Sequence, residues 1–258
     1  MHRADEAAAY NPHRPQESPL CQLLNEHFHH FVAEYEDRFR KTYRFFRQVI
    51  PDVVQKFLQC GDLKLGFARV RYPECHHEYL LAFSCMGHWF CPSCHAKIVI
   101  RFGERLKEKI MYPVPHRQYV FSIPIILHHF LKYDRKLLSR LCQCVNQSLI
   151  IFFRTALNLE DGIHAMVMVI HTFGIYAGWH PHIHVLIADG LFRKSGVFYV
   201  MPRVGFKPLK KLFRAHVLSM LKMEGLTDDT FIAKIMKWRH TSGFSAHNGY
   251  NVPQNLDR

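Results

Sequence analysis

Apolar side chains recur at helical spacing in the first part of the chain. Residues 24–50 place them on one face of a predicted helix, and Pro51 is expected to break or kink it. Residues 60–97 then change to short strand-like segments that are rich in Cys and His and separated by Gly and Pro. A basic helix is expected to follow over residues 96–111.

The second half of the chain mixes strand and helix patterns. Apolar and alternating runs predict strands over 118–123, 164–171 and 182–188, and a hairpin around the turn Ser195-Gly196. Helical spacing predicts helices over 134–157, 207–223 and 228–238. This mixture indicates an α+β fold built on an antiparallel sheet.

The pattern divides the chain into three segments. Residues 1–19 are polar and contain Pro, and are expected to form a disordered tail. A helical and metal-binding domain is expected over 20–112. Pro113 and Pro115 open a second domain over 113–258. A hydrophobic content of 48% is enough for a large core and excludes wholesale disorder.

The charge of the chain indicates its class of partner. With 34 Lys and Arg against 21 Asp and Glu, the net charge is +13, which favours a polyanion such as nucleic acid. The N-terminus lacks an apolar signal segment, and no uncharged apolar run approaches ~18 residues. A cytoplasmic protein with no membrane partner is therefore expected.

Histidines in the strand over 182–188 suggest a metal site. Alternation places His182 and His184 on one face, ~6.6 Å apart along the strand. Neutral imidazole suits Mn, Zn, Fe and Ni, and Mg when phosphate supplies the other ligands. His171, at the end of the preceding strand, is the expected third ligand. His180 is the other candidate, but Pro181 turns it away from that face.

Cysteines indicate a second metal site. Four of the eight lie within residues 75–94, among histidines. Without a signal peptide, such clustering favours metal binding over disulfides.

Three segments together resemble one family. They are Gly66–Cys94, His182-Ile183-His184 and Trp238–Gly249. They are similar to the rolling-circle transposases of the insertion sequence 91 type, which are HUH (His-hydrophobic-His) single-strand endonucleases. The resemblance implies a zinc-binding domain followed by a ferredoxin-like nuclease domain. It also implies Mg²⁺ or Mn²⁺ on His182 and His184.

The same resemblance implies a reaction and a substrate. A tyrosine attacks a phosphate of single-stranded DNA at a transposon end, forms a 5′-phosphotyrosine link and frees a 3′-OH, and the strand then passes to a target. Basic residues interleaved with aromatic ones fit such a substrate. The expected DNA contacts are Arg193, Lys194, Lys207, Lys210 and Lys211.

The sequence departs from the family pattern in its zinc ligands. The family has two Cys-x-x-Cys pairs, of which Cys91-Pro92-Ser93-Cys94 is intact, whereas the first pair reads Tyr72-Pro73-Glu74-Cys75. Tetrahedral zinc needs a fourth ligand beside Cys75, Cys91 and Cys94. Cys85 is the expected one, with His76 and His77 as alternatives.

Two further departures concern the nuclease site. The family carries a glutamine at the position of His171. Its nucleophilic tyrosine lies on a helix downstream of the His-Asn-Gly segment, and this chain stops at Arg258, so it resembles a transposase truncated at its C-terminus. Tyr250 is a weak candidate nucleophile because Asn, Gly and Pro around it predict a loop.

Two alternatives remain open from the sequence. One is a non-catalytic DNA-binding remnant that lacks the nucleophile. The other is a metal-dependent hydrolase of a small molecule, which would need carboxylate ligands near the histidines. Asp189 is the only acidic residue between Asp161 and Glu224, and a site so poor in carboxylates fits a polyanion better.

Overall fold

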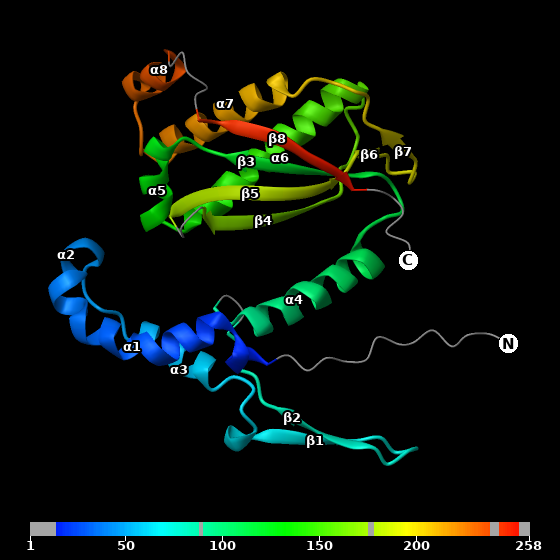
Figure 1. The fold of residues 1–258 in the computed structure, drawn as a ribbon. Coiled ribbons are helices and arrows are strands. Elements are labelled where there is room, and N and C mark those ends of the chain that lie inside the picture. The colour runs from blue at the N-terminus through cyan, green and yellow to red at the C-terminus, as the bar shows by residue number, and fades with distance from the viewer. Residues whose placement is uncertain (1–13, 88–89, 175–177, 238–242, 253–258) are drawn as a thin grey trace. The chain divides into compact units, whose positions relative to one another are not determined.

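The computed structural model describes residues 14–87, 90–174, 178–237 and 243–252. The chain forms two compact units, residues 1–111 and 112–258 (Figure 1). Most of the expected N-terminal tail, and residues 238–242 of the family-like segment Trp238–Gly249, lie outside the described residues. Order begins before residue 20, because a 3₁₀ turn forms at Pro15–Glu17.

Two helices and the start of a third occupy residues 24–50, in which one long helix was predicted. They are α1 (Pro19–Arg38), α2 (Arg40–Tyr43) and α3 (Val49–Leu58). The chain turns at Arg44, whose φ is 69°. Pro51 does not end a helix. It lies in the first turn of α3, where a backbone N–H has no partner within the helix and its loss costs little.

A hairpin and a further helix complete the first unit. Strands β1 (Phe67–Arg71) and β2 (Glu78–Ala82) pair antiparallel, with Phe67 opposite Ala82 and Arg71 opposite Glu78. Helix α4 (Pro92–Arg105) continues into a π-helical turn at Leu106–Ile110. The helix begins earlier than predicted because Pro92 is favourable at the first helical position.

The second unit contains the predicted antiparallel sheet and its helices. Its described strands are β3 (His116–Ser122), β4 (Met166–Phe173), β5 (Trp179–Ala188), β6 (Gly190–Phe192), β7 (Phe198–Val200) and β8 (Ser245–Val252). Its described helices are α5 (His128–Tyr133), α6 (Lys136–Leu157), α7 (Lys207–Met223) and α8 (Asp229–Lys237), with a 3₁₀ turn at Ile125–Leu127.

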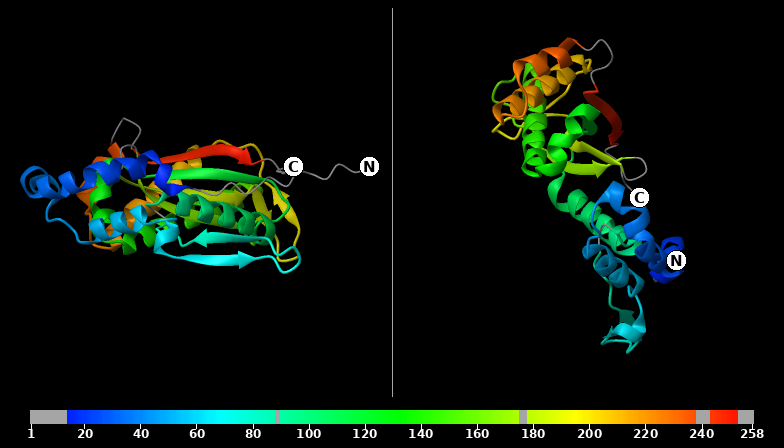
Figure 2. Two further views of the ribbon diagram at one scale, coloured as in Figure 1. Left: turned by 60° about the horizontal axis from the view of Figure 1, so that its bottom comes forward. Right: turned by 90° about the vertical axis from the view of Figure 1, so that its left-hand side faces the viewer.

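The main sheet has the strand order β4-β5-β3-β8, and every neighbouring pair is antiparallel (Figure 2). Strands β6 and β7 form a separate two-stranded hairpin. The succession β3-α6-β4-β5-α7-β8 is the βαββαβ order of ferredoxin-like folds. The α+β class predicted from the sequence is confirmed.

Helices α6 and α7 cover one face of this sheet. Phe121 of β3 meets Phe213 of α7 with ring centroids 5.0 Å apart, and Ile183 and Val185 of β5 are fully buried. Burying each such side chain contributes roughly 1.5–3 kcal/mol. Because strand side chains alternate, this packing places the even-numbered residues of β5 on the opposite, open face.

The segment around Tyr250 is a strand and not the predicted loop. It belongs to β8, which pairs with β3 through a register irregularity between Arg117 and Tyr119. Strand β3 supplies backbone hydrogen-bond partners to this segment. The pairing therefore makes a strand of an Asn- and Gly-rich sequence that by itself predicts a loop. The side chain of Tyr250 lies outside the described residues. Within the described part of the chain, no helix combines the length and apolar character needed to cross a membrane.

Candidate metal centres

Four cysteine sulfurs converge in the first unit. Those of Cys60, Cys85, Cys91 and Cys94 all lie within 4.8 Å of one another. The Sγ–Sγ distances are 3.7 Å for Cys60 and Cys94, 3.6 Å for Cys85 and Cys94, and 3.8 Å for Cys60 and Cys91. Tetrahedral zinc with Zn–S bonds of about 2.3 Å requires sulfurs about 3.8 Å apart. The cluster therefore fits a structural zinc ion.

Three separate segments supply these sulfurs. Cys60 follows α3, Cys85 follows β2, and Cys91 and Cys94 bracket the first turn of α4. The backbone N–H of Cys85 donates to Cys60 Sγ at 3.4 Å, and that of Gly87 donates to Cys85 Sγ at 3.3 Å. Both bonds favour the thiolate form that zinc binds.

Cys75 is not part of the cluster, and Cys60 takes the place expected for it. Cys75 is exposed in the turn between β1 and β2. Four residue steps at ~3.3 Å separate the ends of each strand, so this turn lies roughly 13 Å from the base of the hairpin that leads to Cys85. The alternatives His76 and His77 lie in the same distant region. The Cys60-Gly61 step after a helix was the sequence feature that could have identified the fourth ligand.

Two thiols of this cluster, those of Cys60 and Cys85, are costly to ionise without a cation. Burial raises the pKa of Cys60, and it raises that of Cys85 to about 11. Burial also acts to raise the pKa of Cys94, but hydrogen bonds from the neighbouring thiols outweigh it and lower that pKa overall. A bound cation would stabilise all four thiolates, so zinc binding is expected to release protons and to stabilise the unit.

Three histidines converge on the open face of the sheet. His171 of β4 lies directly opposite His182 of β5 in the register, and His184 is two residues further along. Their ring centroids are 5.2 Å apart for His171 and His182, 4.3 Å for His171 and His184, and 5.1 Å for His182 and His184. One ring nitrogen of each lies within 4.8 Å of the others. The structure thus brings together the three residues named from the sequence.

Neighbouring groups orient these imidazoles. Nδ1 of His182 donates to the backbone oxygen of His180 at 2.7 Å, which leaves Nε2 free to accept a cation. Nδ1 of His184 lies 3.1 Å from the side-chain amide of Gln118. Burial, followed by the neighbouring imidazoles, lowers the pKa of His171 and His184. The lowered pKa favours the neutral form of both imidazoles, which is the form that binds a metal.

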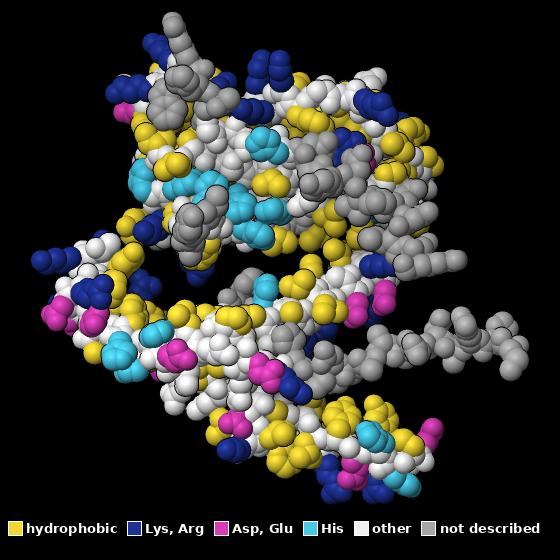
Figure 3. Space-filling view, viewed as in Figure 1, with side chains coloured by type: hydrophobic (Ala, Val, Ile, Leu, Met, Phe, Trp, Pro, Cys, Tyr) yellow, Lys and Arg dark blue, Asp and Glu magenta, His cyan; other side chains and the backbone are white. Residues whose placement is uncertain are grey.

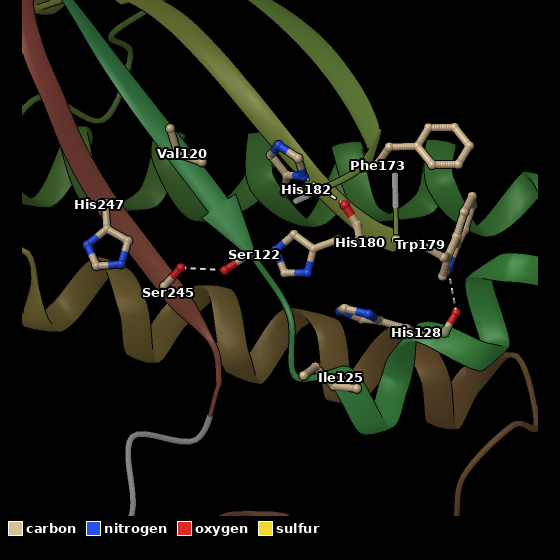
Figure 4. Close-up of a pocket in the computed structure, with 12 residues that line it drawn as sticks. Val120, Ser122, Ile125, His128, Phe173, Trp179, His180, His182, Ser245 and His247 are labelled. Atoms are coloured by element: carbon tan, nitrogen blue, oxygen red, sulfur yellow. Dashed lines mark hydrogen bonds between the residues drawn. The ribbon is translucent and has the colours of Figure 1, made fainter. Parts of the chain in front are cut away.

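A cavity of about 600 Å³ adjoins the histidine cluster and shares His182 with it (Figure 4). Histidine side chains gather over this part of the second unit (Figure 3). No tyrosine, acidic residue, lysine or arginine is among the described residues that line the cavity. The lining residues are Val120, Ser122, Ile125, His128, Phe173, Gly174, Gly178, Trp179, His180, His182, Ser245 and His247.

The acidic residue nearest in sequence has a structural role. Asp189 pairs with Arg117 at 2.6 Å, and both side chains are largely buried. Asp189 does not line the cavity. The small-molecule hydrolase considered from the sequence would need carboxylates among the ligands, and the described residues of the cluster offer none.

The basic residues expected to bind DNA lie away from the histidine cluster. Arg193 and Lys194 are in the turn between β6 and β7, where the Arg193 guanidinium lies 5.5 Å from the ring centre of Tyr199. The others lie on α7, whose Phe213 packs against the opposite face of the sheet. These are Lys207, Lys210 and Lys211.

Comparison with known proteins identifies the family. Residues 27–123 match the transposase zinc-binding domain, and residues 165–252 match a second family model described as a transposase. The chain is 28% identical over 154 residues to the transposase for insertion sequence element IS801 of Pseudomonas savastanoi pv. phaseolicola. That alignment covers 59% of this chain and 36% of the relative, so the chain spans well under two thirds of the relative's length. No solved structure matches.

The two family matches together cover most of the chain; the first lies mainly in the first unit and extends to residue 123, and the second lies within the second unit. Together with the similarity to the IS801 transposase, these matches support a transposase of the insertion sequence 91 type. The match to the zinc-binding domain agrees with the geometry of the four-cysteine cluster.

Proposed function

We propose that this chain binds single-stranded DNA of insertion-sequence ends and targets on the open face of the sheet. In the complete transposase, this site would cleave and join strands through a 5′-phosphotyrosine intermediate. The observation that carries the proposal is the cluster of His171, His182 and His184 beside a cavity whose described lining residues include no carboxylate. The net charge of +13 supports a polyanionic substrate.

The three imidazoles fit a divalent cation, Mg²⁺ or Mn²⁺, because three ring nitrogens leave coordination positions for phosphate oxygens. When bound, such a cation polarises a phosphate and stabilises the charge that develops on it. Contacts within the chain orient two of the three histidines for cation binding. The carbonyl of His180 fixes the tautomer of His182, and Gln118 orients His184.

Two groups of residues would complete the activity. Arg193, Lys194, Lys207, Lys210 and Lys211 would bind phosphates of DNA that extends beyond the histidine site. Tyr250, which directly follows the His-Asn-Gly segment, is the candidate nucleophile within this chain. A DNA-bound protein of this kind would be associated with the nucleoid. A non-catalytic DNA-binding role is the second candidate, favoured because no tyrosine is among the described residues lining the cavity.

A covalent-adduct assay tests the proposal. The chain is mixed with labelled single-stranded DNA and Mn²⁺, and a protein–DNA band that survives denaturation is sought. An adduct lost in Tyr250→Phe would establish both activity and nucleophile. DNA binding without an adduct would support the non-catalytic role. The absence of any Mn²⁺-dependent DNA binding would contradict both.

A further inference from the structure

We propose that the cavity beside His182 receives one unstacked nucleobase of the DNA strand, next to the phosphate held at the histidines. This inference rests on the proposed function and adds a reason for selecting single strands. Because His182 belongs both to the histidine cluster and to the cavity lining, a nucleotide whose phosphate reaches the cluster has its base within reach of the cavity.

The walls of the cavity suit a flat aromatic group. Phe173 and Trp179 meet edge to face at one end, with ring centroids 6.2 Å apart. Ile125 also lines the cavity, and its apolar side chain is 80% exposed. The described lining contains no fixed charge, so it favours a base over a phosphate. Aromatic rings of this kind stack nucleobases whatever their identity.

These walls are held in position before any ligand binds. The indole N–H of Trp179 donates to the backbone oxygen of His128 at 3.0 Å. The ring of His128 packs edge to face against that of His180 at 5.0 Å, and Figure 4 shows His180 between His128 and His182. A pre-positioned stacking surface loses little conformational freedom on binding.

The two serine hydroxyls of the cavity do not select one base. Ser122 and Ser245 join β3 to β8 through their hydroxyls, which lie 2.5 Å apart. A hydroxyl can donate or accept, so the pair can meet the edge of any base. A base inside a duplex, in contrast, must break its pairing and stacking to enter. The cavity would therefore discriminate unpaired from paired nucleotides rather than one sequence from another.

The test compares two probes on the full chain in the presence of Mn²⁺. One is a short oligothymidine, and the other is an oligomer of the same length with abasic residues throughout. The variants are Trp179→Leu and Phe173→Ala. The control is Tyr133→Ala, which removes an aromatic side chain that is 72% exposed and does not line the cavity.

We expect each cavity variant to bind oligothymidine about tenfold more weakly, which corresponds to one lost stacking contact. Binding of the abasic oligomer and of Mn²⁺ should be unchanged, and the control should match the unmodified chain. Equal binding of the two probes by the unmodified chain would overturn the base cavity while leaving the proposed function intact. An equal loss for both probes would also overturn it, since the variants would then act on the fold. No binding of either probe would instead contradict the proposed function itself.

Discussion

The sulfur of Cys60 lies 3.7 Å from that of Cys94, although the β1–β2 hairpin separates the two residues in sequence. The contact brings the end of α3 to the first turn of α4. The buried core around these cysteines is small, with Cys21 and Phe57 as its other buried members. A zinc ion bound by the four cysteines would therefore supply much of the stability of this unit. A substitution of Cys60 is therefore a direct test of the zinc site.

Replacing Cys60 should abolish zinc binding, whereas replacing Cys75 should not. Cys60→Ser removes one of four sulfurs and leaves an incomplete tetrahedral site. Elemental analysis should find about one equivalent of zinc in the unmodified chain and in Cys75→Ser, and far less in Cys60→Ser. The thermal midpoint of the first unit should fall in Cys60→Ser alone. Full zinc content in Cys60→Ser would rule out the four-cysteine assignment.

Removing His171 should weaken Mn²⁺ binding, and removing His247 should not. His171→Ala deletes one of three converging nitrogens, so we expect a loss of about 100-fold or more in Mn²⁺ affinity. His247 lines the adjoining cavity but is outside the cluster, which makes His247→Ala the matched control. Calorimetric titration of both variants measures the difference. An equal effect of the two substitutions would contradict the assignment.

The stability of the second unit should fall below pH 6.5. Burial lowers the pKa of His116, His128 and His164 below their ordinary value of 6.5. Below that pH the unfolded chain binds more protons than the folded one, so the free energy of unfolding decreases as the pH falls. Each unit of pKa lowering contributes up to about 1.4 kcal/mol.

Urea unfolding measured above and about one unit below pH 6.5 tests this dependence. His164→Gln should reduce the slope with pH, because it removes one of the histidines whose pKa burial lowers. A free energy of unfolding that stays constant over this interval would show that these histidines do not titrate as their burial implies.

Substituting Gly190 should disrupt the β6–β7 hairpin. A Cβ at this position would overlap the backbone oxygen of Tyr199 and lie 2.6 Å from Cζ of Phe198. Gly190→Ala should therefore lower the free energy of unfolding by about 3 kcal/mol. Gly205→Ala is the control, since no atom lies within 4 Å of a Cβ there, and its effect should stay within about 0.5 kcal/mol. Chemical denaturation of both variants would reveal the contrast, and similar values would contradict it.

Local patterns in the sequence predicted the elements that depend on nearby residues. Helix α7 was predicted at its observed bounds because apolar spacing and Pro208 both define it. The side-by-side placement of His182 and His184 followed from the two-residue period of a strand. His171 joins them because β4 and β5 pair antiparallel with His171 opposite His182. The short connection between the two strands made this pairing predictable from the sequence.

Tertiary structure decided the features that depend on distant partners. The Asn- and Gly-rich segment around Tyr250 became a strand because β3 offers it backbone partners. The fourth cysteine is Cys60 and not Cys75, because the hairpin carries Cys75 away from the cluster while Cys60 stays at its base. The sequence by itself determined which chemical groups are present and how neighbours alternate. Only packing between distant segments determined which of those groups meet, because spatial proximity between distant residues is set by burial and strand pairing and not by spacing along the chain.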